Sequence, residues 1–120
     1  MKSLQELQEG LNQFTGAIVW YQPLLYPHFL YSKGIRYLAT NADCFWLLDF
    51  IFSNQILSQL KTQPFQVWKI IVNEDDSAKL IVEDGNDNQV TSFHVNYTDF
   101  PINEFSLWMV DNVLILPSEY

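Results

Sequence analysis

ADCFWLLDFIFSNQILSQL, residues 42–60, supplies the apolar centre of this chain. Between Ala42 and Phe52 only Asp43 and Asp49 are charged, and a helix that is apolar on almost every side is typical of a protein core. The apolar run is shorter than the about 20 residues that cross a bilayer, and polar residues from Ser53 onward return the chain to water. The stretch therefore predicts one core helix of a soluble protein over 42–60, with the Asp49 carboxylate in an apolar environment.

Two shorter helices are predicted before this stretch. Ser3 and Glu6 have the spacing of a capping box for a helix over 3–10, and Ser32 can cap a second helix over 32–41. Between them we expect a turn at Thr15 and Gly16, followed by an apolar run over 17–21 that forms either a strand or an extended arm.

Residues 22–31 are rich in aromatic and apolar side chains but contain Pro23 and Pro27. Proline is excluded from a helix interior and pushes the preceding residue toward extended geometry. This irregular segment either covers the core as a lid or lines a groove.

The second half of the chain is strand-like. Apolar or alternating runs over 65–72, 78–83, 89–97, 106–110 and 113–116 predict strands, and the turn-forming residues at 84–88 and 111–112 predict two hairpins. Helices followed by strands indicate an α+β fold. We expect N-terminal helices, then an antiparallel sheet of about five strands, with the 42–60 helix packed on one face.

The chain length of 120 residues fits one domain spanning 1–120, and the apolar fraction of 48% argues against disorder. Cys44 is the only cysteine, so no internal disulfide can form, and its apolar surroundings favour a small core hydrophobe over a catalytic thiol. The first ten residues contain no apolar signal region. We therefore expect a cytoplasmic protein that does not associate with membranes.

Charge is divided unevenly along the chain. Residues 1–70 hold five Lys or Arg against four Asp or Glu, whereas residues 71–120 hold one Lys against ten Asp or Glu. The acidic half would repel phosphate backbones, which argues against direct nucleic-acid binding. It either meets a basic surface of a protein partner or keeps an aromatic-rich domain soluble.

Seven short stretches, taken together and in order, carry a resemblance that spans nearly the whole chain: FTG (14–16), GIRYLA (34–39), WLLD (46–49), FQVWK (65–69), EDGN (83–86), YTDFP (97–101) and LPSEY (116–120). The sequence resembles a family of small bacterial proteins, found in cyanobacteria and on mobile elements, that is classed only as a domain of unknown function. The resemblance implies a self-contained bacterial protein and assigns no catalytic residues. Asp43-Cys44 departs from the small residues expected there.

Asp49 is the first candidate for chemistry, because a carboxylate in an apolar helix must be paired, hydrogen-bonded or protonated. It is a structural anchor, a general acid or base with a raised pKa, or an exposed carboxylate if the helix is less buried. A small-molecule or catalytic pocket would need Asp49, His28 and Arg36 to converge. His28, among aromatic residues, is expected to be packed or hydrogen-bonded.

Familiar enzyme motifs are missing: the sequence has no glycine-rich phosphate loop, nucleophile elbow or metal-ligand spacing. We therefore predict no cofactor and no metal, and favour a non-enzymatic module that binds a protein partner. The residues expected to contact that partner are Trp20, Tyr21, Tyr26, Tyr31, Asp99 and Glu119. Residues 118–120 form either an ordered end of the chain or a carboxylate-rich hook for the partner.

Overall fold

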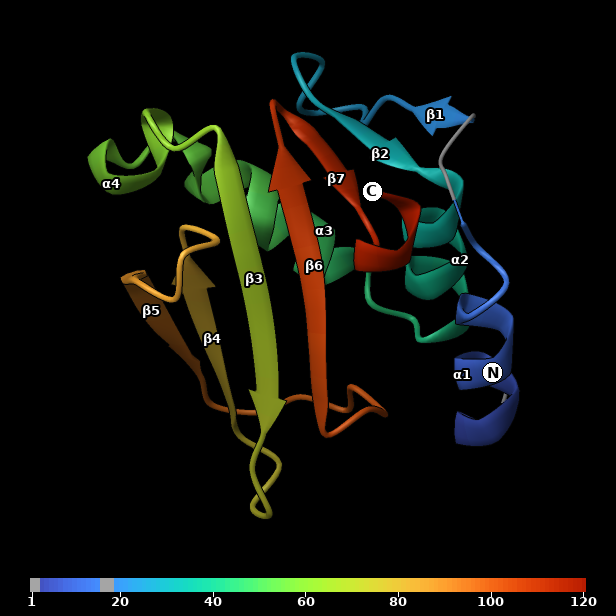
Figure 1. Cartoon of the computed structure of the whole chain (residues 1–120). Helices are drawn as coiled ribbons and strands as arrows, with labels where there is room; N and C mark the ends of the chain where they lie inside the picture. The colour runs from blue at the N-terminus through green and yellow to red at the C-terminus, as the bar shows by residue number, and fades with distance from the viewer. Residues whose placement is uncertain (1–2, 16–18) are drawn as a thin grey trace.

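The computed structural model describes residues 3–15 and 19–120 (Figure 1). Gly16 of the predicted Thr15–Gly16 turn and residues 17–18 of the predicted apolar run lie outside these residues. The helices are α1 (Leu4–Leu11), α2 (Lys33–Asn41), α3 (Phe45–Ser53) and α4 (Ser58–Lys61), with 3-10 turns η1 (Asn54–Ile56) and η2 (Pro117–Glu119). The strands are β1 (Trp20–Tyr21), β2 (Leu30–Ser32), β3 (Phe65–Val72), β4 (Ala78–Glu83), β5 (Gln89–Val95), β6 (Glu104–Val110) and β7 (Val113–Ile115).

The α+β class is confirmed, but the sheet has seven strands, in the order β1-β2-β7-β6-β3-β4-β5, and not five. The five predicted strands form the antiparallel part. The two additional strands come from the segment around Pro23 and Pro27, which turns so that Tyr21 pairs with Tyr31. Strand β2 then joins β7 in parallel. This parallel pair makes the sheet mixed and links the two halves of the chain.

The predicted helix over 42–60 is divided. Helix α3 ends at Ser53, and Leu57 is extended, with φ −62° and ψ 140°. The Ser53 hydroxyl and the Asn54 side-chain amide both donate to the carbonyl oxygen of Phe50, at 3.1 and 2.8 Å. Such side-chain bonds offer the backbone an alternative to a continued helix, and this explains why the polar tail of the stretch leaves the helix.

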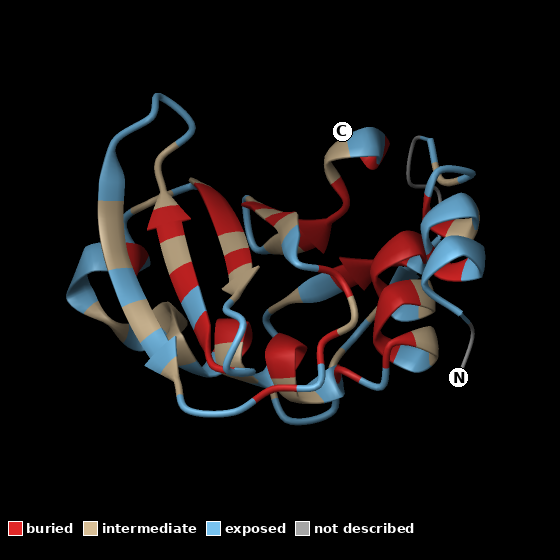
Figure 2. Ribbon diagram, turned by 90° about the horizontal axis from the view of Figure 1, so that it is seen from below, coloured by how far each residue is buried: buried red, intermediate tan, exposed pale blue. Residues whose placement is uncertain are grey.

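One face of the sheet is covered by α2 and α3 (Figure 1). At its centre the Trp68 ring stacks on Phe93, with centroids 5.9 Å apart, and the edge of Phe50 meets both rings. Buried residues lie along the inner strands and on the helix sides that face them (Figure 2). This layer of aromatic and aliphatic side chains is the core.

Helix α3 has a solvent-exposed stripe that its sequence does not reveal. Phe45, Asp49 and Ser53 are exposed, while the side facing the sheet buries Leu47, Leu48, Ile51 and Phe52. The exposed residues are spaced by four and therefore share one side of the helix. The sheet covers α3 from one side only and leaves Asp49 exposed to solvent. The expectation that Asp49 lies in an apolar environment is therefore wrong.

Candidate functional site

The three residues predicted to form a pocket are separated. Asp49 is exposed on α3, His28 is exposed in the β1–β2 connection, and Arg36 is exposed on α2 with its guanidinium carbon 4.4 Å from the centre of the Tyr21 ring. Arg36 lines a shallow hollow with residues of the β1 and α2 region, but neither Asp49 nor His28 lines it. His28 is exposed, and not packed as expected, because Pro27 places it in a turn beyond the aromatic cluster.

Glu119 is buried, so the expectation of a carboxylate hook for a partner is wrong at this position. Its carboxylate accepts hydrogen bonds from the Ser32 hydroxyl, from the Leu116 backbone N–H at 2.9 Å and from the Gly34 backbone N–H at 3.1 Å. Ser32 also caps α2 by accepting from the Ile35 N–H at 3.2 Å. Glu119 therefore places a negative charge at the positive end of the α2 dipole, and residues 117–119 are an ordered structural clasp.

The four aromatic interaction candidates divide between two environments. Tyr31 is buried and Tyr21 stacks on it, with centroids 5.6 Å apart, while Tyr26 lies 5.9 Å from the Phe52 ring. These three contribute to the lid over the core. Trp20 alone is exposed, at 44%. The sequence did not predict the other apolar side chains that are exposed in this segment. The segment is short and interrupted by prolines, so its apolar residues show no clear periodicity from which exposure could be predicted.

The exposed apolar residues of this segment are Trp20, Leu24, Leu25 and Leu30, which we call the hairpin surface. Leu24 is 94% exposed, Leu25 74% and Leu30 36%. Of the ten exposed large apolar residues in the described part of the chain, five lie between positions 19 and 30. Side chains of this size seldom gather at a surface without a reason, since clustered apolar patches mark binding sites.

The acidic loops of the second half of the chain lie far from the hairpin surface in the sheet order. The β3–β4 and β4–β5 loops and the exposed Asp99 belong to the β5 edge, whereas the hairpin surface belongs to the β1 edge. The charged neighbours of β1 and β2 in the described chain include Lys33 and Arg36, which begin α2, the buried Glu119, and Asp111 in the β6–β7 turn beside Leu30.

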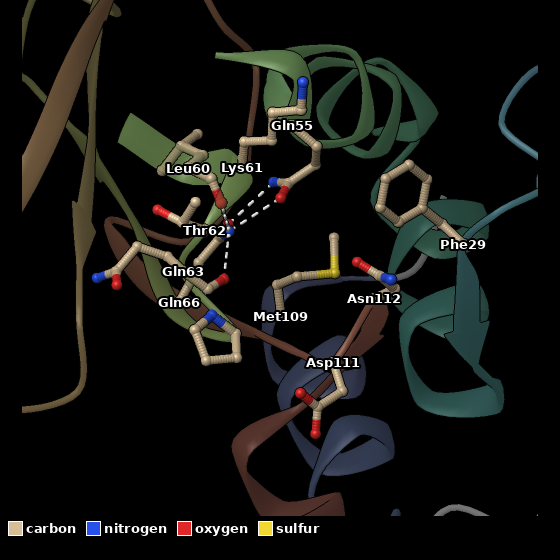
Figure 3. A pocket seen from close by; sticks show the side chains of 11 residues that line it. Phe29, Gln55, Leu60, Lys61, Thr62, Gln63, Gln66, Met109, Asp111 and Asn112 are labelled. Atoms are coloured by element: carbon tan, nitrogen blue, oxygen red, sulfur yellow. Dashed lines mark hydrogen bonds between the residues drawn. The ribbon is translucent and has the colours of Figure 1, made fainter. Parts of the chain in front are cut away.

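A hollow of about 460 Å³ opens where β3 begins and the β6–β7 turn ends (Figure 3). In it the Gln55 and Gln66 amides exchange two hydrogen bonds of 2.9 Å. Gln66 also accepts from the Trp68 indole and donates to the carbonyl oxygens of Leu60 and Gln63. The sequence signal for this network is a glutamine within the otherwise apolar start of β3.

The remaining lining of this hollow is mixed in character. Met109 lies between the glutamine pair and Asp111, and Phe29 forms another wall (Figure 3). Lys61 and Asp111 are its charged lining residues, and it is lined by neither histidine nor cysteine. Because the two glutamine amides already bond to each other, the arrangement stabilises the start of β3 and offers no nucleophile with an adjacent histidine base.

Cys44 is unsuited to nucleophilic chemistry. Burial, with further contributions from the charges of Asp43 and Asp99, raises the pKa of its thiol to about 12. The reactive form of cysteine is the thiolate, so the thiol stays protonated at neutral pH. The expectation that Cys44 serves as a small core hydrophobe is confirmed by its complete burial.

In the described part of the chain, no three His, Cys, Asp or Glu side chains are placed to hold a metal ion. No helix among residues 3–15 and 19–120 is both long enough and apolar enough to cross a membrane.

Comparison with known proteins identifies a matching family. The model of a family described as "Family of unknown function (DUF6876)" matches residues 5–120. No curated protein and no solved structure matches the chain.

Proposed function

The chain belongs to the Family of unknown function (DUF6876), and from the surface of this member we propose that it is a protein-interaction module whose partner binds the hairpin surface. The observation that carries the proposal is the exposure of Leu24 and Leu25, at 94% and 74%. If a partner buries these two adjacent leucines, each contributes about 1.5–3 kcal/mol of favourable free energy to binding.

The hairpin surface rests on an ordered base. Behind it Tyr31 and Phe29 pack against Phe52, with ring centroids 6.4 and 5.4 Å away. The Gln22 side-chain amide donates to the carbonyl oxygen of Pro27 at 2.7 Å and closes the connection. A surface that is ordered before binding loses little conformational entropy on association, which favours recognition of a folded partner.

The distribution of charge around the hairpin surface favours binding through apolar contacts over binding through charge alone. The hairpin surface itself carries no charged side chain, and the positive groups of Lys33 and Arg36 lie at its base. A central apolar patch with a charged rim is the usual anatomy of a protein interface. We therefore expect the partner to present an apolar pocket for the leucines, with acidic residues around it.

The proposal is tested with the tagged full chain. Protein is captured from a lysate of the native organism after nuclease treatment, and stoichiometric partners are identified by mass spectrometry. The pair Leu24→Ser and Leu25→Ser should abolish capture of that partner without lowering the thermal stability. The matched control is Ile56→Ser with Tyr97→Ser, since both residues are strongly exposed elsewhere, at 81% and 70%.

The result that would contradict the proposal is equally clear. Either full retention of the partner by the Leu24→Ser, Leu25→Ser variant, or an equal loss with the control variant, would remove the hairpin surface from the interface. A preparation of the wild-type chain that captures no stoichiometric partner would count against an interaction module altogether.

A further inference from the structure

The two edges of the sheet differ in how well they are protected. At one edge β1 is only two residues long, whereas at the other edge β5 extends over seven residues, Gln89–Val95. In the described chain β4 is the only strand that pairs with β5, so the backbone groups on the outer side of β5 have no strand partner, and helix α4 also contacts β5. Natural edge strands are usually shortened, bulged or covered, or carry lysine, proline or inward charges. The pairing of β5 with β4 shifts register between Val82 and Glu83, and Thr91–Val95 pair regularly beyond that irregularity. No Lys, Arg, Asp, Glu or Pro occurs in Gln89–Val95.

The side chains of β5 define what an added strand would meet. Phe93 packs on Trp68 and Phe50 in the core layer, and Val90 and Val95 are half-buried against the same core. Ser92 and His94 alternate with Phe93 and Val95 and are exposed. A strand added here would continue the core with apolar residues on one face and place polar residues on the other.

Carboxylates lie at both ends of β5. Asp84 and Asp87 are in the loop just before Gln89. The β3–β4 loop, with Glu74, Asp75 and Asp76, reaches the other end, because Ala78 pairs with Val95 and the Thr98 N–H donates to the Asp76 carbonyl oxygen at 2.7 Å. The edge is therefore an uncharged strand between two negative loops, and the ends of an added strand would lie beside those loops.

We propose that the free edge of β5 binds an extended peptide segment of a partner protein by strand addition, and that this segment alternates apolar and polar residues and carries Lys or Arg at both ends. A second copy of this chain does not fit the same edge. Antiparallel pairing of two β5 strands would bring the loop holding Asp84 and Asp87 against the loop holding Glu74, Asp75 and Asp76, twice. Like charges in contact oppose such pairing.

The test uses the full chain and three synthetic nine-residue peptides: KKVTVTVKK, EEVTVTVEE with reversed charge, and KKVTPTVKK, whose central proline breaks the strand. Binding is measured by fluorescence anisotropy, and the site is located by amide hydrogen exchange. KKVTVTVKK should bind and protect amides of Gln89–Val95, whereas the other two should bind at least about tenfold more weakly. Increasing the salt concentration should weaken binding, since exposed charge pairs are screened.

Variants separate this site from the hairpin surface. Asp76→Asn with Asp87→Asn removes one charge at each end of β5 and keeps residues that tolerate the positive φ of 66° and 63° found there. This pair should raise Kd about threefold to tenfold. Glu9→Gln with Asp111→Asn removes two charges elsewhere and should leave Kd unchanged. Leu24→Ser with Leu25→Ser should also bind the peptide as the wild type does, so the two proposals can fail separately.

Several outcomes would overturn the proposal: no binding of KKVTVTVKK at about 2 mM peptide, equal binding of EEVTVTVEE, or protection confined to amides outside β5. Protection of β5 without peptide, together with a dimeric mass in light scattering, would assign the edge to a second copy instead.

Discussion

The carboxylate of Glu119 lies against the backbone of Gly34, 85 positions earlier in the chain. The Gly34 N–H donates to Glu119 Oε2 at 3.1 Å, and a Cβ on Gly34 would lie 2.7 Å from Glu119 Oε1 and 2.6 Å from Leu116 Cδ1. Gly34 is therefore needed for close approach. The contact fastens the end of the chain to the start of α2.

Gly34→Ala should destabilise the protein by about 1–3 kcal/mol, because the added methyl group collides with a buried carboxylate that cannot move without losing its hydrogen bonds. The free energy of unfolding from urea titration checks this. Thr40→Ala, at an exposed position of the same helix, is the control and should change stability by less than about 0.5 kcal/mol. Equal stability of Gly34→Ala and the wild type would show that the clasp is not tight.

Gln66→Leu should cost about 2–4 kcal/mol in stability. The leucine fits the space, but it leaves the Gln55 amide, the Trp68 indole N–H and the carbonyl oxygens of Leu60 and Gln63 without the bonds that Gln66 makes. Thermal and urea denaturation measure the loss. The variant Gln55→Leu with Gln66→Leu should lose less than the two single changes added together, since it removes both amides of the pair.

Cys44 should not react with thiol reagents while the protein is folded. A thiol with a pKa of about 12 is thiolate to about one part in ten thousand at pH 8, and complete burial blocks access. Absorbance after addition of Ellman's reagent should show almost no release of the chromophore. In denaturant the same sample should release one equivalent, and rapid labelling of the folded protein would contradict the buried placement.

Asp84 should contribute to acid sensitivity. Hydrogen bonds from the Asn86 backbone N–H and from the Asn88 side chain hold the pKa of Asp84 below its ordinary value of 3.8. Because the folded-state pKa is the lower one, the ionised carboxylate stabilises the fold above the unfolded value, and this contribution is lost as pH falls through the folded value. Asp84→Asn should therefore flatten the decline of Tm below pH 3.8. Asp111→Asn, at a turn position where the carboxylate makes no hydrogen bond in the described structure, should not.

Local patterns predicted the elements that depend on neighbouring residues. The Ser3–Glu6 capping box and the Ser32 cap are present at the predicted places. The hairpin turn at Asp111 and Asn112 is also present, with positive φ at both residues as such turns require. In each case the residues that determine the geometry lie within a few positions of one another, so the sequence contains the necessary information.

The candidate sites were predicted less well, because exposure depends on distant parts of the chain. Helix α3 looks apolar on all sides in sequence, yet the sheet covers only one side and leaves Asp49 in water. The aromatic segment was expected to act as a single unit, but pairing of Tyr21 with Tyr31 turns these rings inward. Leu24 and Leu25 became a candidate surface only once their exposure was known.

The α+β class, the positions of the caps and turns and the membership of a family of unknown function follow from the amino-acid sequence alone, since these depend on local periodicity and on motif order. Two features depend on contacts between distant segments: Glu119 is a buried clasp and not a hook, and β2 pairs in parallel with β7. Hydrogen-bonding partners that lie 85 positions apart, such as Gly34 and Glu119, produce no periodic pattern in the sequence of either segment. Burial of a charge is decided by whether such a distant segment supplies the hydrogen bonds that replace water.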